Sequence, residues 1–473
     1  MFLRRPARLR RAATATAFGV CLLTATAVPA PASVEQEPPS TAAPVAAPVG
    51  GLRSYLVITS PHATARAKKA VVANRGEVFA SYDKIGVVVA HSTATDFAER
   101  LRAAKGVQQV GATRTSDVPA AAADPAIPPA PAQTTPSEAE TTRADMTQIG
   151  ADKAWAVDTG SRSVTVGVLD TGVDDQHHDL EPNFDATQSA SCAYGRLDTR
   201  PGSWREVGTH GTHVAGTIAA AKNGVGAIGV APTVKIASVR VAEPGTQLFF
   251  AENTICAFVF AGDQRFEVTN NSYFTDPWQF HCPSDPDQAA ILEGIERATA
   301  YAEGRGVLHV VAAGNANYDL AAKTTDGSSP NDSTPTTRPI TNDCRTAPAE
   351  MPGIVAVSSI GAENTKSGFS NFGTDKITVA APGEAVYSTV PGGGYGVKSG
   401  TSMASPHVAG TAALLASAIP GATPAQLRAR LAADADDLPC ADARCAGTTA
   451  KNNFYGEGRV DAAEAVRGLW GIR

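Results

Sequence analysis

Three short motifs place an aspartate, a histidine and a serine among small residues. Asp170 lies in Val-Leu-Asp-Thr-Gly, His210 in Gly-Thr-His-Gly-Thr-His-Val-Ala-Gly, and Ser402 in Gly-Thr-Ser-Met-Ala-Ser-Pro-His. A serine hydroxyl is a weak nucleophile until an imidazole takes its proton, and the imidazole needs a carboxylate to fix its tautomer. Small neighbouring residues let a substrate backbone approach closely. The three residue types therefore predict nucleophilic catalysis by Ser402, with His210 as the base and Asp170 orienting it.

The elements that must position these residues alternate along the chain. Beyond residue 145, apolar runs typical of strands alternate with helix candidates such as residues 287–303 and 403–418. The strand candidates are residues 164–169, 234–241, 266–270, 307–312, 354–359 and 377–380. Several are almost continuously apolar, as strands buried on both faces are. We expect an α/β fold with a mostly parallel central sheet flanked by helices, and the chemistry at the carboxyl ends of its strands.

The three motif blocks, in the order Asp170, His210, Ser402, resemble those of the subtilisin-like serine peptidases. The resemblance spans residues 144–473 and implies a subtilisin-like domain that hydrolyses peptide bonds in protein or peptide substrates. It also implies that the loop ending in Asn315 forms an oxyanion hole. There the Asn315 side-chain amide and the Ser402 backbone N–H would stabilise the tetrahedral intermediate.

Other motifs invite different interpretations. His213 and His407 are expected on the buried sides of helices, as structural histidines. His210 and His213 are three residues apart, but no HExxH motif or third ligand accompanies them, which argues against zinc catalysis. Residues 224–229 satisfy GxGxxG without a following helix, so neither a dinucleotide site nor any organic cofactor is expected. Ser402 lacks the GxSxG pattern, and the aspartate precedes it, which argues against an α/β-hydrolase.

The resemblance further implies a structural Ca²⁺ ion. In many relatives a loop after the catalytic-histidine helix wraps this ion, with help from an acid shortly after the catalytic aspartate. Asp179 and Asn223 match those side-chain ligands, and the carbonyl groups of Ala221, Val225 and Ala227 would complete the oxygen shell. In the alternative interpretation, Asp179 is a solvated surface acid and the glycines of this loop only make a tight turn.

Substrate recognition rests on the same resemblance. Asn271, Ser272 and Tyr273 resemble the edge strand that pairs with an extended substrate backbone, and Gly314 is counted with them as a substrate-binding residue. The family continues this strand with small or aliphatic residues, whereas this chain has Tyr273-Phe274 and then an insertion. We expect substrate to add as a β-strand, with a hydrophobic preference.

Residues 52–115 have apolar runs in the order β-α-β-β-α-β, which predicts a small ferredoxin-like α+β domain. This segment resembles the inhibitory propeptides of the family, which would assist folding, block the active site and be cut away autocatalytically. It contains ten Lys and Arg against four Asp and Glu, a net charge of +6, whereas residues 145–473 contain twenty-four against thirty-six, a net charge of -12. Unless this difference arose by chance, it favours docking of the segment as an intramolecular inhibitor. Residues 116–143, rich in Pro and Ala, predict an exposed linker suited to cleavage.

Residues 1–32 are typical of a signal peptide, with five arginines before an apolar stretch and small residues after it. A twin-arginine signal and a lipoprotein anchor at Cys21 are alternatives, although the residues after Arg4-Arg5 match poorly and Val20 precedes the cysteine. No later run reaches about eighteen apolar residues. We therefore expect a secreted protein without stable membrane association.

Composition narrows the function classes. The chain has 473 residues, of which 43% are hydrophobic and 18% charged, with a formal net charge of -6. This apolar content excludes wholesale disorder and a coiled coil. Because no Lys- and Arg-dense run lies beyond the N-terminus, we expect no nucleic-acid partner.

The cysteines that would remain after export are Cys192, Cys256, Cys282, Cys344, Cys440 and Cys445. An even number in an oxidising compartment predicts disulfides, which can pair in fifteen ways. Cys440 and Cys445 are close enough to pair with each other. The resemblance places Cys282 and Cys344 beside the substrate pocket, so we expect a bridge there and a remaining pair of Cys192 with Cys256.

Together these observations predict a secreted serine endopeptidase made as an autoprocessed precursor. A catalytically idle binding protein on the same scaffold is one alternative, against which the intact Asp170, His210, Ser402 and Asn315 argue. A dedicated processing peptidase that cuts one partner is another, and a cleavage profile on mixed peptides would separate it from a broad protease.

Overall fold

The computed structural model describes residues 51–135, 138–440 and 442–467, so the predicted signal peptide over residues 1–32 lies outside the described residues. The described residues all belong to one compact unit. No helix within these ranges is long and apolar enough to span a membrane.

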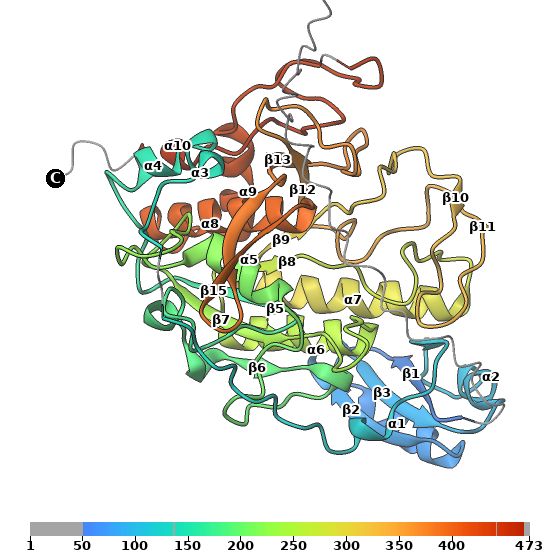
Figure 1. Ribbon diagram of the computed structural model, residues 1–473. Helices are drawn as coiled ribbons and strands as arrows, with labels where there is room; N and C mark the ends of the chain where they lie inside the picture. The colour runs from blue at the N-terminus through green and yellow to red at the C-terminus, as the bar shows by residue number, and fades with distance from the viewer. Residues whose placement is uncertain (1–50, 136–137, 441, 468–473) are drawn as a thin grey trace, which may run out of the picture. The chain divides into compact units, whose positions relative to one another are not determined.

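A seven-stranded parallel sheet in the order β13-β12-β9-β8-β5-β7-β6 forms the centre of the larger domain (Figure 1). Its strands are β5 Thr165–Asp170, β6 Ala190–Ser191, β7 Lys235–Arg240, β8 Val268–Asn271, β9 Leu308–Ala312, β12 Val355–Ile360 and β13 Val379–Pro382. The six predicted strands are present, with boundaries that differ by no more than two residues. The short edge strand β6 was not predicted, because two residues give no periodic signal.

Helices cover both faces of this sheet. The four main helices are α5 His210–Ala219, α6 Ala251–Gln264, α7 Pro286–Gly304 and α8 Thr401–Ala418. Side chains of β5 alternate between two cores: Val166 and Val168 pack in the cluster that contains α5 and α8, whereas Leu169 packs in the cluster of α6 and α7. The period of two therefore sorts the helices to opposite faces and confirms the predicted α/β architecture.

The other helices and strands of the larger domain are short. They are α3 Ala144–Gln148, α4 Ala151–Ala154, β10 Thr325–Asp326, β11 Arg338–Pro339, β14 Val386–Val390, β15 Gly394–Lys398, α9 Pro424–Ala433 and α10 Ala462–Ala465, with 3₁₀ turns at Glu181–Asn183, Ala186–Gln188 and Ala193–Gly195. The hairpin β14-β15 is antiparallel and packs beside α5, where Ser388 Oγ donates to the carbonyl oxygen of His213 at 2.7 Å.

The N-terminal segment forms a separate antiparallel sheet in the order β2-β3-β1-β4. Its elements are β1 Arg53–Ile58, α1 Thr64–Ala73, β2 Glu77–Tyr82, a 3₁₀ turn Asp83–Ile85, β3 Val87–Ser92, α2 Phe97–Arg102 and β4 Gln109–Ala112, followed by a 3₁₀ turn Ala120–Ala122. This is the predicted β-α-β-β-α-β order. Tyr55 and Val57 pack with the segment's own helices, whereas Leu56 and Ile58 join the core cluster of α6 and α7. The small sheet therefore has two apolar faces and packs with one of them on the larger domain.

Three disulfides join the cysteines in the expected pairs: Cys192–Cys256, Cys282–Cys344 and Cys440–Cys445. Cys282 and Cys344 pack in an apolar cluster with Phe280. Close to this bridge, Thr346 Oγ1 donates to the carbonyl oxygen of Gln279 at 3.0 Å, and both residues line the pocket described below. The bridge thus fastens two segments that form one wall of that pocket.

Candidate active site

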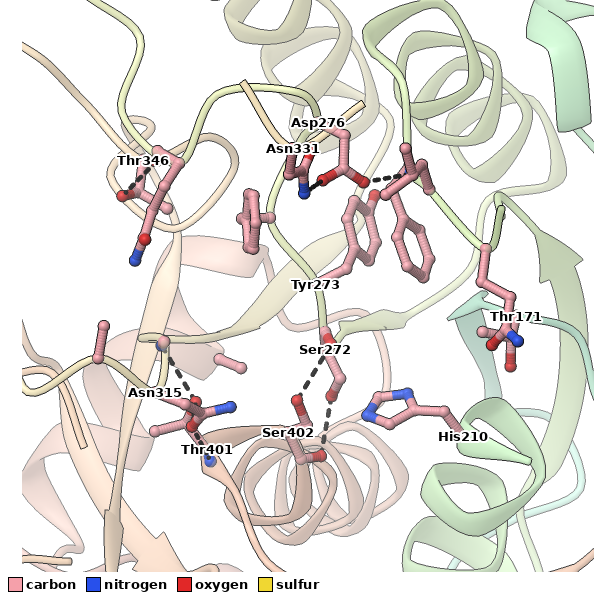
Figure 2. A pocket seen from close by; sticks show the side chains of 18 of the residues that line it. Thr171, His210, Ser272, Tyr273, Asp276, Asn315, Asn331, Thr346, Thr401 and Ser402 are labelled. Carbon is pink, nitrogen blue, oxygen red and sulfur yellow. Dashed lines mark hydrogen bonds between the residues drawn. The ribbon is translucent and has the colours of Figure 1, made fainter. Parts of the chain in front are cut away.

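The buried carboxylate of Asp170 and the half-buried imidazole of His210 form a pair at the carboxyl end of β5. The strand ends at Asp170, and α5 begins at His210. His210 Nδ1 lies 2.8 Å from Asp170 Oδ1, which also accepts the backbone N–H of Thr171 at 2.7 Å. Because the carboxylate holds Nδ1, that nitrogen carries the proton and the opposite ring nitrogen faces the pocket next to Ser402 (Figure 2).

Ser402 is the second residue of α8, where backbone N–H groups lack partners within the helix. Its hydroxyl donates to the carbonyl oxygen of Ser272 at 3.1 Å, and the Ser272 hydroxyl donates to the carbonyl oxygen of Ser402 at 2.9 Å (Figure 2). Ser272 directly follows β8, so the central sheet positions the first turn of α8. Ser402 is half-buried and lines the pocket together with His210.

Asn315 follows β9 and is exposed at the pocket. Its Oδ1 accepts both the backbone N–H and the hydroxyl of Thr401, each at 2.8 Å. With the oxygen held in this way, the amide nitrogen is the part of the side chain left to donate to a ligand. The preceding Gly314 has φ +103°, and a Cβ there would lie 2.4 Å from Asn371 Nδ2, so this turn requires glycine.

The pocket that these residues share has a volume of about 840 Å³. Ser272, Tyr273 and Gly314 line it, as expected for substrate-binding residues (Figure 2). The predicted Asn271 does not: it is buried inside the sheet, where its Nδ2 donates to the carbonyl oxygen of Val310 at 3.2 Å. As the last residue of a parallel strand, its side chain points into the core and not into the pocket.

An aromatic wall that the sequence did not reveal lies opposite Asn315. The ring of Phe249 stacks on Tyr273 with a centroid separation of 4.6 Å and an interplanar angle of 6°, and Phe274 lines the pocket beside them. Asp276 accepts hydrogen bonds from the backbone N–H of Phe249 and from Asn331 Nδ2. Burial raises the pKa of Asp276 to about 7, despite these two donors. The run Leu248-Phe249-Phe250 was the available signal for this wall.

The two other motif histidines are structural, as predicted. His213 is buried and its Nε2 lies 3.1 Å from the carbonyl oxygen of Val386. Burial, followed by the charges near it, lowers the pKa of His213 to about 3, so its ring stays neutral. His407 is also buried, with Nδ1 2.8 Å from the carbonyl oxygen of Met403 and Nε2 3.1 Å from Asp145 Oδ2.

The two side chains predicted as calcium ligands, Asp179 and Asn223, are hydrogen-bonded to each other. Asp179 Oδ1 accepts Asn223 Nδ2 at 3.0 Å, and its Oδ2 accepts the N–H of Ala227 at 2.9 Å and the hydroxyl of Tyr395 at 2.8 Å. Asn223 turns its amide nitrogen to Asp179, because its Oδ1 accepts the N–H of Val225 at 3.1 Å. Hydrogen-bond donors therefore surround the carboxylate where Ca²⁺ would need oxygen atoms, and this arrangement does not fit the ion. The alternative interpretation of Asp179 as a solvated surface acid is wrong, since this residue is fully buried.

Two further side chains lie against this aspartate. His178 Nε2 is 3.6 Å from Asp179 Oδ1 and 2.6 Å from the Tyr395 hydroxyl, while His177 Nε2 lies 2.9 Å from the carbonyl oxygen of Gly394. The Nε2 atoms of both histidines thus contact residues of β15, whereas His177 Nδ1 accepts the backbone N–H of Asp179 at 3.1 Å. We conclude that Asp179 and its neighbours fasten that hairpin to the loop at residues 221–227.

The linker, residues 116–143, begins beside the pocket and then follows the side of the domain. The N–H and the hydroxyl of Ser116 both donate to Asp332 Oδ2 at 2.8 Å, next to Asn331, which lines the pocket. Within the described residues, Val118 packs with Tyr194, Gln133 Nε2 donates to Asp174 Oδ2 at 2.9 Å, and Glu140 Oε2 accepts the N–H of Asn223 at 3.0 Å. No described residue before Thr171 lines the pocket. The segment thus packs beside the pocket without lining it, and its action as a block on the active site stays a prediction.

A parallel α/β sheet that places a serine and a histidine at one pocket, with a buried aspartate behind the histidine, defines a serine peptidase with the subtilisin fold. The sequence profile of the Subtilase family matches residues 161–458, and the chain belongs to this family of serine endopeptidases. It is 32% identical to subtilisin NAT of Bacillus subtilis subsp. natto over 65% of this chain and 67% of that protein, and 32% identical to the subtilisin of Bacillus pumilus over 65% and 92%.

Solved structures agree on the fold. The crystal structure of the epidermin leader peptide processing serine protease from Staphylococcus aureus has a TM-score of 0.69 and 22% identity, covering 89% of this chain and 99% of that one. Fervidolysin from Fervidobacterium pennivorans has a TM-score of 0.64 and 24% identity, covering 88% and 61%. At these identities the likeness shows the architecture alone.

Proposed function

We propose that this subtilase is a secreted endopeptidase in which Ser402 is the nucleophile, His210 the general base and Asp170 its orienting carboxylate. The observation that carries the proposal is the 2.8 Å contact between His210 Nδ1 and Asp170 Oδ1 beside a serine at a helix N-terminus. The buried carboxylate fixes the tautomer in which the other imidazole nitrogen accepts the Ser402 proton.

The reaction then follows from the positions of these groups. The Ser402 hydroxyl leaves the Ser272 carbonyl, gives its proton to His210 and attacks the scissile carbonyl carbon. The Asn315 amide and the Ser402 backbone N–H stabilise the resulting oxyanion. His210 returns the proton to the departing amine, and a water molecule, deprotonated by the same imidazole, hydrolyses the acyl-enzyme.

Substrate is proposed to bind as an extended strand along Ser272 and Tyr273, with Gly314 on the other side of the pocket. The stacked rings of Phe249 and Tyr273 and the side chain of Phe274 offer an apolar surface at this wall. They support a preference for hydrophobic side chains near the cleaved bond. The structural calcium of the resemblance is not assigned to Asp179 and Asn223, whose donor set does not fit it.

The precursor is proposed to consist of a signal peptide over residues 1–32, a propeptide domain over 52–115, a linker over 116–143 and the peptidase domain over 144–473. Disulfides in the peptidase domain support export to an oxidising compartment. Ion pairs between the basic segment and the acidic domain, such as Lys84 Nζ to Asp263 Oδ1 at 2.6 Å, support its role as an intramolecular partner. Because the contacts of the N-terminal segment lie outside the pocket, we propose that this segment inhibits the enzyme by fixing the position of the pocket wall. We further propose that Ser402 removes the segment autocatalytically.

The decisive experiment compares purified wild type with Ser402→Ala by intact mass and by labelling with a serine-directed fluorophosphonate. We expect wild type to lose the N-terminal segment within the linker and to take the label, and Ser402→Ala to do neither. If both keep the segment, a second protease is used to cut the linker before labelling is repeated. A wild type that remains unlabelled after that cut contradicts the catalytic proposal.

A further inference from the structure

The most deeply buried ion cluster of the described residues joins the N-terminal segment to the peptidase domain. Arg114, just after β4, donates from Nη1 to Glu243 Oε2 at 3.1 Å and from Nη2 to Glu243 Oε1 at 2.6 Å. The same Nη2 donates to Glu252 Oε1 at 2.6 Å. All three side chains are no more than 2% exposed.

The pocket around this guanidinium is specific in shape as well as in charge. The central guanidinium carbon of Arg114, Cζ, lies 3.7 Å from the centre of the Phe250 ring, which allows stacking and a cation–π contact. Glu243 meets the guanidinium with both oxygens, the bidentate geometry that an ammonium group cannot match. Phe250 and Glu252 lie at the start of α6, where the helix dipole favours a carboxylate.

Glu243 and Glu252 are two buried carboxylates that contact the same Arg114 nitrogen, and they need a cation between them. Within the described residues, Glu252 Oε2 has no hydrogen-bond partner, and neither does Asn253 Oδ1 in the same turn. Asn253 Nδ2 reaches Glu243 Oε1 only at 3.4 Å. Without Arg114, the like charges would repel in a medium that screens them poorly, and burial would leave them unsolvated.

We propose that Glu243, Glu252 and the ring of Phe250 form a guanidinium-binding pocket of the peptidase domain, built for one arginine side chain and occupied by Arg114 in the full-length chain. The ligand class is the guanidinium cation, and neither a simple ammonium ion nor a general positive field replaces it.

The guanidinium-binding pocket lies directly behind the pocket that contains Ser402, which is the proposed substrate cleft. Glu243 begins the loop 243–249, which it closes through its N–H to the carbonyl oxygen of Leu248 at 3.0 Å and its own carbonyl oxygen to the N–H of Gln247 at 2.9 Å. Leu248 and Phe249 line the pocket that contains Ser402. An arginine bound to Glu243 therefore fixes the base of a loop whose far side forms the wall of the cleft.

Chemical rescue tests the pocket without using catalysis. All variants carry Ser402→Ala, so that they stay full-length, and thermal unfolding is followed by circular dichroism. Arg114→Ala leaves a cavity with two unpaired carboxylates, and we expect the unfolding midpoint to fall by roughly 5 °C or more. Millimolar guanidinium chloride should restore most of this loss in a saturable manner, whereas methylammonium chloride at the same concentration should not.

Two controls isolate the pocket. Arg102→Ala removes another arginine that joins the same two parts of the chain, through Asp287 Oδ1 at 2.9 Å, but both side chains are 38% exposed. We expect a shift of less than about 1 °C there, and no response to guanidinium. Arg114→Met fills the cavity with an apolar side chain, so it should be destabilised and not rescued.

Equal midpoints for Arg114→Ala and Arg102→Ala would overturn the proposal, and so would equal responses of Arg114→Ala to guanidinium and methylammonium. If Arg114→Ala gives no folded protein, Arg114→Lys carries the test. The single ammonium group cannot bridge Glu243 and Glu252 with bidentate geometry, so this variant should melt clearly below its parent. A lysine variant that melts with the parent refutes a site built for guanidinium.

Discussion

Ser272 and Ser402 are joined by two reciprocal hydrogen bonds, each hydroxyl donating to the other residue's carbonyl oxygen, at 2.9 and 3.1 Å. One bond holds the nucleophile candidate in its resting position. The other, from the Ser272 hydroxyl, ties the first turn of α8 to the end of β8. Ser272, at the proposed substrate edge, thus also positions the helix terminus where the proposed oxyanion donor lies.

Ser272→Ala removes the hydroxyl that holds the Ser402 carbonyl and leaves the backbone of residue 272 in place. We expect kcat to fall roughly fivefold, the effect of about one neutral hydrogen bond, with little change in KM. Steady-state kinetics on a peptide substrate measure both constants. Ser272→Thr keeps the hydroxyl and should recover most of kcat. A change confined to KM would show that Ser272 acts on substrate binding alone.

Asn315→Ala removes the side-chain amide whose oxygen is held by Thr401. We expect kcat to fall by about 10²- to 10³-fold with a nearly unchanged KM, because the donor acts on charge that develops in the transition state. The unfolding midpoint should fall by a few degrees at most, because the exposed side chain buries little area but its loss leaves the N–H and hydroxyl of the buried Thr401 without their shared acceptor. Asn317→Gly is the matched control: its side chain accepts from Lys366 Nζ at 2.9 Å and does not line the pocket. A similar loss in the control would contradict the assignment.

Asp276 should make stability depend on pH below neutrality. Burial raises its pKa in the folded protein to about 7, above the value of 3.8 that the unfolded chain is expected to have. The folded state therefore binds more protons between these values, and its stability falls as pH rises through about 7. In Asp276→Asn this contribution is absent, so the difference in unfolding free energy between variant and wild type should change by about 3 kcal/mol from pH 4 to pH 7.

Chemical denaturation of the Ser402→Ala protein and of its Asp276→Asn derivative at several pH values measures this difference. Parallel stability curves over that pH range would mean that Asp276 titrates at an ordinary pKa. Because Asp276 accepts the N–H of Phe249, its ionisation also acts on the aromatic wall of the pocket.

Chelation tests the hydrogen-bonded arrangement at Asp179. Since three donors already occupy its carboxylate, we expect EDTA to shift the unfolding midpoint of the full-length Ser402→Ala protein by less than about 1 °C. Differential scanning calorimetry with and without added CaCl₂ measures the shift. A fall of several degrees that Ca²⁺ reverses would show that Asn223 and Tyr395 give way to the ion in solution.

The sequence predicted the sheet strands, the order of the small domain and the triad candidates, because each depends on local signals. Continuous apolar runs identify buried strands. Asp170, His210 and Ser402 each lie in a motif of small residues, a pattern that few other kinds of site need. The position of Asn271 was predicted wrongly, because a strand's last residue can face the core or the pocket and only the register decides which.

Features built from distant segments could not be predicted. Tyr395 and Asp179 are 216 positions apart. No local sequence pattern predicts that the hairpin β14-β15 places the Tyr395 hydroxyl against the Asp179 carboxylate. The stacking of Phe249 on Tyr273 and the cluster of Arg114 with Glu243 have the same origin. Charge counting predicted that the basic segment docks on the acidic domain, but not that one arginine is buried while most of the others remain at the surface.

Because of the course of the linker, cleavage of the linker and dissociation of the N-terminal domain are two separate events. Its C-terminal part stays attached to the peptidase domain through Glu140 and Asn223, while the preceding domain stays anchored through Arg114. Breaking one peptide bond between these points removes neither anchor. A nicked chain would therefore run as two pieces on a denaturing gel and as one particle in gel filtration. The lifetime of that two-chain complex, and not the speed of cutting, would then set how quickly free enzyme accumulates.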